Sequence, residues 1–135
     1  APVVRGVDAR SLQALARSIV EAATRARRRS LVPDDLAGGT FTVTNPGQYG
    51  TLFQFPIINQ PQVAILSTDG IARRPAVVVD DDGHESIEAR SMGVLALAWD
   101  HRAFDGAYAA AFLRSMKQTL EGADWAARWA VGADR

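Results

Sequence analysis

The sequence predicts an α+β fold in which a mixed or mostly antiparallel sheet is covered by helices. Two observations indicate it: apolar residues recur at helical spacing near both ends of the chain, and several short β-rich runs lie between them. With 135 residues, 47% of them hydrophobic and 22% charged, the chain has the size and composition of one globular domain. Fifteen basic and fifteen acidic residues leave no net charge, which argues against a nucleic-acid partner.

The composition also excludes several kinds of site. The chain contains no cysteine, so disulfides, cysteine-ligated zinc and a cysteine nucleophile are ruled out. No apolar run approaches the roughly 20 residues that span a bilayer, and no signal peptide opens the chain. We therefore expect a cytoplasmic location and no membrane partner.

The first helix is predicted over residues 9–28, where apolar side chains at helical spacing form one stripe. Asp8 is expected to cap this helix, and the arginine-rich stretch 25–29 suits its C-terminal end. Residues 33–36 predict a single helical turn, which two glycines then end.

The middle of the chain predicts strands separated by turn residues. The run at 92–99 is nearly uncharged, which is typical of a central strand buried on both faces. The turn residues at 81–84 indicate a hairpin. The predicted strands cover residues 40–44, 62–68, 76–80, 86–90 and 92–99.

After the last strand, residues 100–106 predict a loop and residues 107–121 a second long helix that Gly122 stops. Four side chains of this helix are expected to point inward. They are Phe112, Leu113, Met116 and Leu120. Trp125 and Trp129 follow on a short tail. They are expected to pack the tail onto the domain, with a contact between subunits as the second interpretation.

The segment with the most chemical content is the loop Asp100-His101-Arg102-Ala103-Phe104-Asp105-Gly106. It follows a strand and precedes a helix, so rigid elements hold it at both ends, as in many functional loops. Histidine exchanges protons readily at neutral pH, which makes His101 a candidate general base. On this local pattern alone, a histidine that only satisfies the loop by hydrogen bonds is an equally good interpretation.

The pattern Asp-His-Arg-x-x-Asp-Gly, between an apolar strand and a helix, resembles the signature of the dihydrolipoyl acyltransferases. These are the core components of 2-oxoacid dehydrogenase complexes. The segments 38–45, with Gly47 and Gly50 after it, and 56–66 are similar to two further motifs of this family. The resemblance runs in order from about Pro2 to Glu121, and three motifs in register are far more specific than the histidine motif alone.

The resemblance implies a chloramphenicol-acetyltransferase-like two-layer sandwich that assembles as a trimer, with residues 1–135 as the C-terminal portion of one catalytic domain. It implies an active-site channel between subunits, which coenzyme A and a dihydrolipoyl arm enter from opposite ends. Carried over by position, His101 is the general base, Thr44 steadies the tetrahedral intermediate, and Asp105 supports the histidine loop. In this family the hydroxyl and the histidine come from neighbouring subunits. No metal is implied.

The expected reaction transfers an acyl group from S-acyl-dihydrolipoamide to coenzyme A. A positioned base that removes the thiol proton during attack typically contributes ~10²–10⁴-fold. A hydroxyl aimed at the oxygen that becomes negative contributes roughly 3–4 kcal/mol. One thioester replaces another, so no acyl-enzyme is needed, and the sequence has no Gly-x-Ser-x-Gly elbow.

The resemblance also implies partners. Lys117 is the only lysine and lies in a helical pattern, whereas a lipoyl group needs a lysine on a tight hairpin. The lipoyl group is therefore expected on a separate domain. The other expected partners are the decarboxylase and dihydrolipoyl dehydrogenase components, in a homotrimer or a larger assembly.

Several of these residues also have structural interpretations. Thr44 suits a strand because it is β-branched. Asp105 is expected to hold the loop by hydrogen bonds and ion pairing rather than to move protons. Arg102 is expected to form a structural ion pair rather than to contact coenzyme A phosphates. His84 and the run Asp80-Asp81-Asp82 are interpreted as a solvated turn, because the acidic run lacks calcium-loop spacing.

The match departs from the family in two respects. The front of the catalytic domain, the lipoyl module and the subunit-binding module are expected to lie outside these residues, together with an arginine that would pair with Asp105. We therefore expect little or no activity from the 135 residues alone. In addition, relatives often carry glycine or alanine where this chain has Ser67-Thr68-Asp69-Gly70. The choice among acetyl, succinyl and branched-chain acyl groups stays open.

Two other functions remain as alternatives to the acyltransferase core. One is a noncatalytic oligomeric core module that keeps the fold only for assembly. The other is a free-standing O-acetyltransferase of the chloramphenicol type, which the motif at 40–45 argues against.

Overall fold

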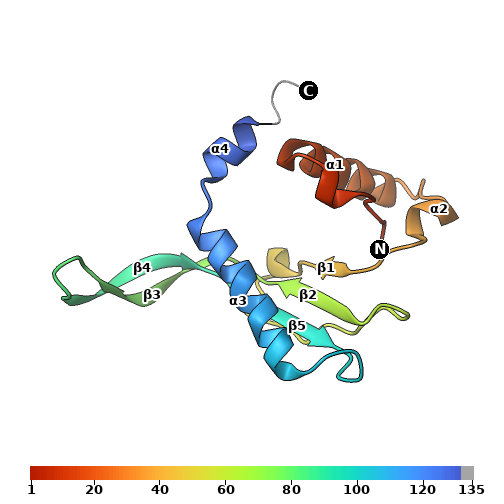
Figure 1. Cartoon of the computed structure of the whole chain (residues 1–135). Helices are drawn as coiled ribbons and strands as arrows, with labels where there is room; N and C mark the ends of the chain where they lie inside the picture. The colour runs from red at the N-terminus through yellow and green to blue at the C-terminus, as the bar shows by residue number, and fades with distance from the viewer. Residues whose placement is uncertain (132–135) are drawn as a thin grey trace. The chain divides into compact units, whose positions relative to one another are not determined.

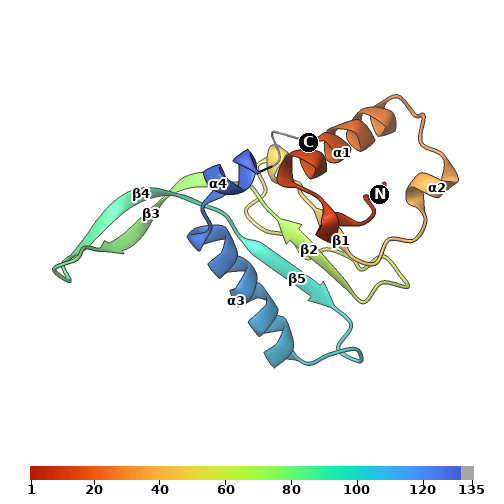
Figure 2. The ribbon, with the colours of Figure 1, turned by 45° about the horizontal axis from the view of Figure 1, so that its top comes forward.

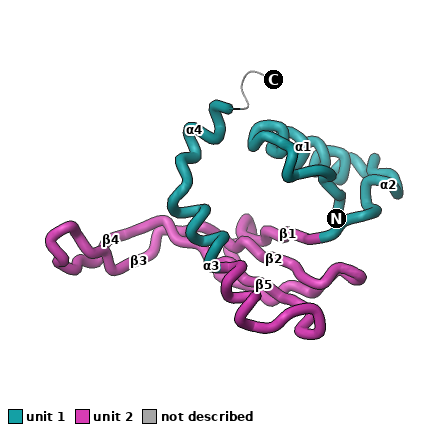
Figure 3. The backbone as a smooth tube through the Cα atoms, viewed as in Figure 1, with its two compact units in different colours: residues 1–40, 114–135 teal, residues 41–113 magenta. Residues whose placement is uncertain are grey.

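The computed structural model describes residues 1–131 (Figure 1). The chain divides into two compact units: unit 1 contains residues 1–40 and 114–135, and unit 2 contains residues 41–113 (Figure 3). No helix among the described residues is both long and apolar enough to cross a membrane. The elements in chain order are η1 (Val7–Ala9), α1 (Leu12–Arg27), α2 (Pro33–Leu36), β1 (Thr42–Thr44), η2 (Gly47–Tyr49), β2 (Ala64–Thr68), β3 (Ala72–Val79), β4 (Glu85–Met92), β5 (Leu95–Trp99), α3 (Gly106–Gly122) and α4 (Trp125–Ala130).

Unit 2 is built on a mixed three-stranded sheet whose middle strand is β2. β1 pairs with β2 in parallel, and β5 pairs with β2 in the antiparallel sense. The apolar side chains of β2 are buried, and Ala109 of α3 is buried as well. Figure 2 shows the beginning of α3 lying along this sheet, and the rings of Phe41 and Phe112 meet edge to face at 6.1 Å. The predicted α+β fold with a mixed sheet is confirmed.

The prediction that residues 92–99 form the central buried strand is wrong. β4 ends at Met92, and β5 begins only at Leu95. β5 is an edge strand of the described sheet, and its five residues are half-buried. β2 has the central place because strands flank it on both sides. An uncharged run indicates apolar surroundings, but it does not indicate how many strands lie beside it.

The predicted hairpin is confirmed and is longer than expected. β3 and β4 form a separate antiparallel ribbon that extends away from the three-stranded sheet (Figures 1 and 2). The tip closes through hydrogen bonds from the Asp80 N–H to the His84 carbonyl (3.1 Å) and from the Gly83 N–H to the Asp80 carbonyl (3.0 Å). Val77 lies opposite Ile87 in the ladder, and both side chains are exposed.

In unit 1 the first helix starts later than predicted. Val7–Ala9 forms a separate 3₁₀ turn after Gly6, which has a left-handed backbone (φ 59°). The cap of α1 is Ser11, whose hydroxyl accepts the Ala14 N–H at 3.2 Å. The prediction that Asp8 caps a helix beginning at residue 9 is therefore wrong, because the turn around Asp8 closes before α1 begins.

The predicted helical turn at residues 33–36 is confirmed as α2, which an ion pair joins to α1. The Arg25 guanidinium donates to both carboxylate oxygens of Asp35, with Nη1 at 2.8 Å from Oδ1. The Val32 N–H donates to the same carboxylate at 2.7 Å. The Val32 backbone hydrogen bond, followed by the one from Arg25, holds the pKa of Asp35 below its ordinary value.

The second long helix is confirmed as α3, but its buried face differs from the prediction. Leu113 and Met116 are half-buried as expected, whereas Phe112 and Leu120 are exposed. The one fully buried residue of α3 is the small Ala109. Gly122 is the last helical residue and not the first residue after the helix.

The tail forms α4, and it packs within unit 1. Asp124 caps α4 by accepting the Ala127 N–H at 2.9 Å. The Trp125 indole N–H donates to the Leu120 carbonyl at 2.9 Å. The Gln13 side chain of α1 donates to the Trp129 carbonyl at 2.9 Å, which joins α1 to α4. These contacts join the tail to its own chain through hydrogen bonds, but the Trp125 and Trp129 side chains are exposed, so the prediction that the two rings pack the tail onto the domain is not borne out.

Candidate active site

The histidine loop, residues 100–106, joins β5 to α3 and is fixed by backbone hydrogen bonds. The Asp100 N–H donates to the Val63 carbonyl at 2.8 Å, which extends the β2–β5 ladder into the loop. The Ala103 N–H donates to the Asp100 carbonyl at 2.9 Å and closes a tight turn. His101 lies inside this turn, so its backbone is held on both sides.

An ion pair inside the loop strengthens the turn. The Arg102 Nη2 lies 2.6 Å from Asp100 Oδ2, and the Arg102 backbone N–H donates to Asp100 Oδ1 at 2.9 Å. The side-chain hydrogen bond from Arg102, followed by its backbone hydrogen bond, lowers the pKa of Asp100 to about 2. The same pair raises the pKa of Arg102. The predicted structural ion pair of Arg102 is therefore confirmed.

Aromatic rings support the loop from one side. The Trp99 indole N–H donates to the Phe104 carbonyl at 3.1 Å, and the rings of Trp99 and Phe104 stack at 6.2 Å. Phe104 also meets Tyr108 edge to face at 5.5 Å. These contacts fix the loop through aromatic packing.

The His101 side chain is exposed, and its ring lies 5.6 Å from the Trp99 ring at an angle of 37°. Within residues 1–131, no hydrogen bond or ion pair engages its imidazole nitrogens. The loop is held by its backbone, by Asp100 and by Trp99, so His101 is not needed to satisfy it. The ring is therefore positioned by a rigid support while both nitrogens remain open to a ligand.

Asp105 has a clear structural role at the start of α3. Its Oδ1 accepts the Tyr108 N–H at 2.9 Å, which is the geometry of a helix N-cap. Its carbonyl accepts the Ala109 N–H at 3.1 Å. No hydrogen bond or ion pair joins Asp105 to the His101 ring in the described part of the chain. Asp105 thus fixes the direction in which the loop enters the helix.

Thr44 and His101 do not meet in one chain. Thr44 is the last residue of β1 and pairs with Ser67, whereas Trp99, two residues before His101, pairs with Ala64. The three residue steps from Ser67 to Ala64 cover roughly 10 Å along β2, at ~3.3 Å per residue. The two predicted site residues therefore lie toward opposite ends of the same sheet.

A buried polar cluster beside Thr44 was not predicted as part of the site. Ser67 is 0% exposed and Asp69 is 4% exposed. The hydroxyls of Ser67 and Thr51 donate to Asp69 at 3.1 and 2.9 Å, and the Gln54 side chain donates to Ser67 at 3.0 Å. In the sequence, the only signal is a polar run directly after the apolar residues of β2, and such a run is equally typical of a strand that ends in solvent.

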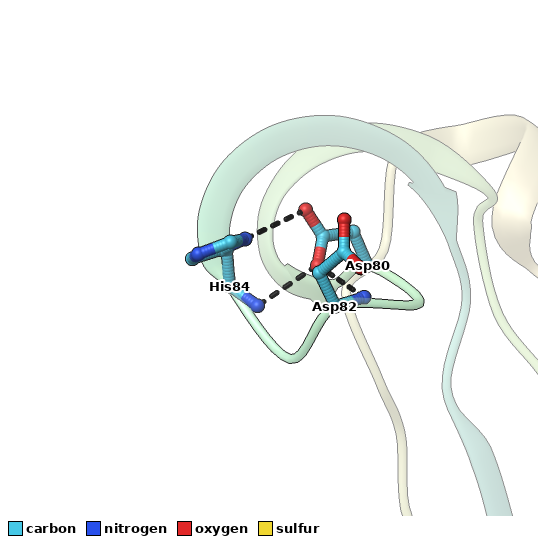
Figure 4. A group of neighbouring side chains, drawn as sticks. All are labelled: Asp80, Asp82 and His84. Carbon is cyan, nitrogen blue, oxygen red and sulfur yellow. Dashed lines mark hydrogen bonds and ion pairs between the residues drawn. The ribbon is translucent and has the colours of Figure 1, made fainter.

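The hairpin tip holds one further group of titratable side chains (Figure 4). Atoms of Asp80, Asp82 and His84 that could bind a metal lie within 4.8 Å of one another, and all three residues are exposed. Asp80 Oδ1 already accepts the N–H groups of Asp82 (3.0 Å) and His84 (2.8 Å), and Oδ2 lies 3.4 Å from His84 Nδ1. These interactions agree with the predicted turn, and the absence of a metal site stays a prediction.

Known proteins match this chain over 89% of its length. The chain is 51% identical over 120 residues to the dihydrolipoyllysine-residue acetyltransferase component of the pyruvate dehydrogenase complex of Mycobacterium bovis, covering 89% of this chain and 22% of that relative. It is 42% identical over 120 residues to the human mitochondrial dihydrolipoyllysine-residue succinyltransferase component of the 2-oxoglutarate dehydrogenase complex, covering 89% of this chain and 25% of that relative. The chain thus spans about a quarter or less of these relatives' length.

Solved structures show the same fold. A probable dihydrolipoamide acetyltransferase from Listeria monocytogenes superposes with a TM-score of 0.80 at 42% identity, covering 89% of this chain and 49% of that one. The cubic core of a pyruvate dehydrogenase multienzyme complex superposes with a TM-score of 0.80 at 37% identity, covering 94% and 49%. The family model for the 2-oxoacid dehydrogenases acyltransferase (catalytic domain) matches residues 1–127. Because that match spans nearly every described residue, the histidine loop included, the chain belongs to the 2-oxoacid dehydrogenase acyltransferase family, of which it carries part of the catalytic domain.

Proposed function

We propose that this chain is the C-terminal portion of an acyltransferase catalytic domain that moves an acyl group from a dihydrolipoyl thiol to coenzyme A, with His101 as general base. The observation that carries the proposal is the exposed imidazole on a rigid loop, with no ring nitrogen engaged by residues 1–131. A base must have such a free nitrogen to reach a substrate proton.

The reaction then runs in balanced steps. A nitrogen of His101 takes the proton of the coenzyme A thiol while the sulfur attacks the carbonyl carbon of the acyl-dihydrolipoyl thioester. The carbonyl π electrons move to the oxygen and give a tetrahedral intermediate. When the carbonyl re-forms, the bond to the dihydrolipoyl sulfur breaks, and that thiolate takes the proton back from the imidazolium. The enzyme returns to its starting state without a covalent intermediate.

Thr44 is the proposed hydroxyl donor to the oxygen that becomes negative. Since Thr44 and His101 lie toward opposite ends of one sheet, we propose that each site combines His101 of one copy with Thr44 of a neighbouring copy. Asp105 serves the site by capping α3 and so fixing the loop that carries His101.

The surface of unit 2 supports a larger assembly. Large apolar side chains are unusually exposed there, with Phe55 at 86% and Ile57 at 88%, and Tyr49, Ile71 and Ile87 are exposed as well. Apolar groups gathered on one unit mark surfaces that other protein covers. We propose that the front of the catalytic domain and neighbouring copies in a trimer cover them.

The remaining parts of the proposal concern partners. The relatives are named as components of pyruvate and 2-oxoglutarate dehydrogenase complexes, and we propose the same setting for this chain. Its lipoyl group would be carried by a separate domain, and its partners would be a decarboxylase and a dihydrolipoyl dehydrogenase. A cytoplasmic location stays a prediction.

The test replaces His101 by alanine in the full-length protein and measures acyl transfer from an acylated lipoyl domain to coenzyme A. Turnover is expected to fall by ~10²–10⁴-fold while the oligomeric state stays unchanged, because the base acts only on the chemical step. His84→Ala is the matched control, because His84 is the other histidine of these 135 residues and lies at the exposed hairpin tip. It should leave turnover unchanged.

Two results would contradict the proposal. Unchanged turnover after His101→Ala, with the oligomer intact, would favour the noncatalytic core module. Transfer to a hydroxyl acceptor such as chloramphenicol, with none to coenzyme A from the lipoyl donor, would favour the free-standing O-acetyltransferase.

A further inference from the structure

Asp69 is buried at the end of β2, and the reaction proposed above does not use it. A buried carboxylate is costly unless hydrogen bonds satisfy its oxygens. Both oxygens are satisfied: Oδ1 accepts the Thr51 hydroxyl at 2.9 Å, and Oδ2 accepts the Ser67 hydroxyl at 3.1 Å. No ion pair to Asp69 occurs within residues 1–131. Hydroxyl groups alone therefore hold this carboxylate.

Each hydroxyl group that contacts the Asp69 carboxylate donates its hydrogen bond to a carboxylate oxygen. An ionised carboxylate only accepts, so both hydroxyls must turn their hydrogens to it. Ser67 then has only lone pairs to offer, and its oxygen accepts the Gln54 side-chain amide at 3.0 Å. We call these four residues, Thr51, Gln54, Ser67 and Asp69, the Asp69 clamp. It joins the loop that follows β1 to the end of β2.

Backbone contacts also join the loop after β1 to the end of β2. The Gly70 N–H donates to the Thr51 carbonyl at 3.2 Å, and the Asp69 N–H donates to the Val94 carbonyl at 3.2 Å. A Cβ on Gly47 would lie 2.7 Å from the Gly70 Cα, which is closer than real side chains approach backbone. The turn that begins at Gly47 thus lies directly against Gly70, the residue after Asp69.

Thr44 is connected to the Asp69 clamp in two ways, through strand pairing and through the chain that follows it. It pairs with Ser67 in the parallel β1–β2 ladder, and it lies three residues before Gly47. Residues opposite each other on neighbouring strands have side chains on the same face, roughly 5 Å apart. The Thr44 hydroxyl and the Ser67 hydroxyl therefore share one face of the sheet, and the segment after Thr44 is held by the clamp.

We propose that Asp69 is a positioning residue for Thr44: its carboxylate locks the loop after β1 onto β2 and so fixes the Thr44 hydroxyl at the oxygen that becomes negative. This inference rests on the proposed function of Thr44. Asp69 itself does not touch the substrate. It acts by keeping one donor in place before the reaction begins, which is the condition under which such donors are effective.

The test is a double-mutant cycle on kcat in the full-length protein assembled with its lipoyl domain. Asp69→Ala is expected to lower kcat roughly 10- to 100-fold with little change in KM for coenzyme A, because a misplaced donor affects the transition state more than the bound substrate. In a Thr44→Ala background the same change should lower kcat by less than about twofold, because no hydroxyl is left to misplace.

A conservative replacement separates positioning from simple loss of structure. Asp69→Asn keeps one oxygen that accepts from Ser67, and its amide can donate to the Thr51 hydroxyl, which also accepts. Its kcat should stay within about threefold of wild type. If Asp69→Ala does not fold, Thr51→Val replaces it in the double-mutant cycle with Thr44→Ala. Thr51→Val removes only one hydrogen-bond donor to the Asp69 carboxylate.

Thr42→Val is the matched control. Its hydroxyl lies at the other end of β1 and bonds the side chains of Gln62 (2.7 Å) and Asn59 (3.3 Å). Thr42→Val should lower the midpoint of thermal unfolding and leave kcat unchanged, both in the wild-type protein and in the Thr44→Ala variant.

The outcomes separate this inference from the proposed function. Equal losses of kcat on replacing Asp69 with and without Thr44, or wild-type kcat in Asp69→Ala, overturn the positioning role alone. Unchanged kcat in Thr44→Ala overturns both the role of Thr44 and the positioning role. Strong coupling between the two positions, together with rescue by asparagine, supports the proposal.

Discussion

Mixing two inactive variants tests whether each site is shared between copies. One variant carries His101→Ala, and the other carries Thr44→Ala. The β1–β2–β5 register separates the two positions by roughly 10 Å along β2 before the further two residues to His101 are added, at ~3.3 Å per residue. A base on the attacking thiol and a donor on the adjacent carbonyl oxygen must each lie within about 3 Å of their atoms. One copy of the chain therefore does not supply both the base and the hydroxyl donor of a single site.

The expected activity follows from the assembly. In a trimer mixed at random from equal amounts of the two variants, a shared site needs an intact His101 from one copy and an intact Thr44 from its neighbour. About one quarter of the sites meet both conditions, so about one quarter of wild-type turnover should return. Sites built within one copy would all be defective, because every chain carries one of the two replacements.

The assay denatures and refolds the two full-length variants together and measures acyl transfer to coenzyme A. Each variant refolded alone is the baseline, and refolded wild type sets the full value. Refolded mixtures that stay at the baseline, while wild type regains its activity, would refute the shared site and with it the interpretation of the sheet register.

Two further predictions concern the histidine loop. Lowering the pH from about 4 to about 2 should break the Asp100–Arg102 ion pair. The pKa of Asp100 is lowered to about 2 in the folded protein, compared with 3.8 in the unfolded chain. The ion pair therefore stabilises the fold above pH 3.8, and this stabilisation is lost as the pH falls toward 2. The difference in unfolding midpoint between wild type and Asp100→Asn, measured against pH, should shrink over this range, and a pH-independent difference would contradict the assignment. Asp105→Ala should cost about 1 kcal/mol of unfolding free energy through the lost cap of α3, as measured by urea denaturation, whereas Asp105→Ser should retain most of it.

Local patterns predicted the elements that depend on near neighbours in the chain. The β3–β4 hairpin follows from turn residues between two β-rich runs, and the helical turn α2 follows from Pro33 and the acidic residues after it. The loop that carries His101 was predicted for the same reason, since an apolar strand and a helix bracket a short polar segment. Each of these signals is contained within a few residues.

Features that depend on distant neighbours were missed or misassigned. The cap of α1 is the exception, because this misassignment is local: Gly6 starts a separate turn ahead of the helix, and Ser11 caps α1 in place of Asp8. β2 and not β5 is the middle strand, because β1 and β5 pair on its two sides. The polar end of β2 is buried because a loop that starts after β1 folds onto it.

The sequence by itself determined the family, the histidine loop and the candidate residues His101, Asp105 and Thr44, because these are patterns of residue type along the chain. Only the tertiary structure decided which residues are close in space. It placed Thr44 away from His101 and beside the buried polar cluster that contains Asp69. The physical reason is that strand register and burial are set by pairing between segments far apart in the chain, and no local pattern records that pairing.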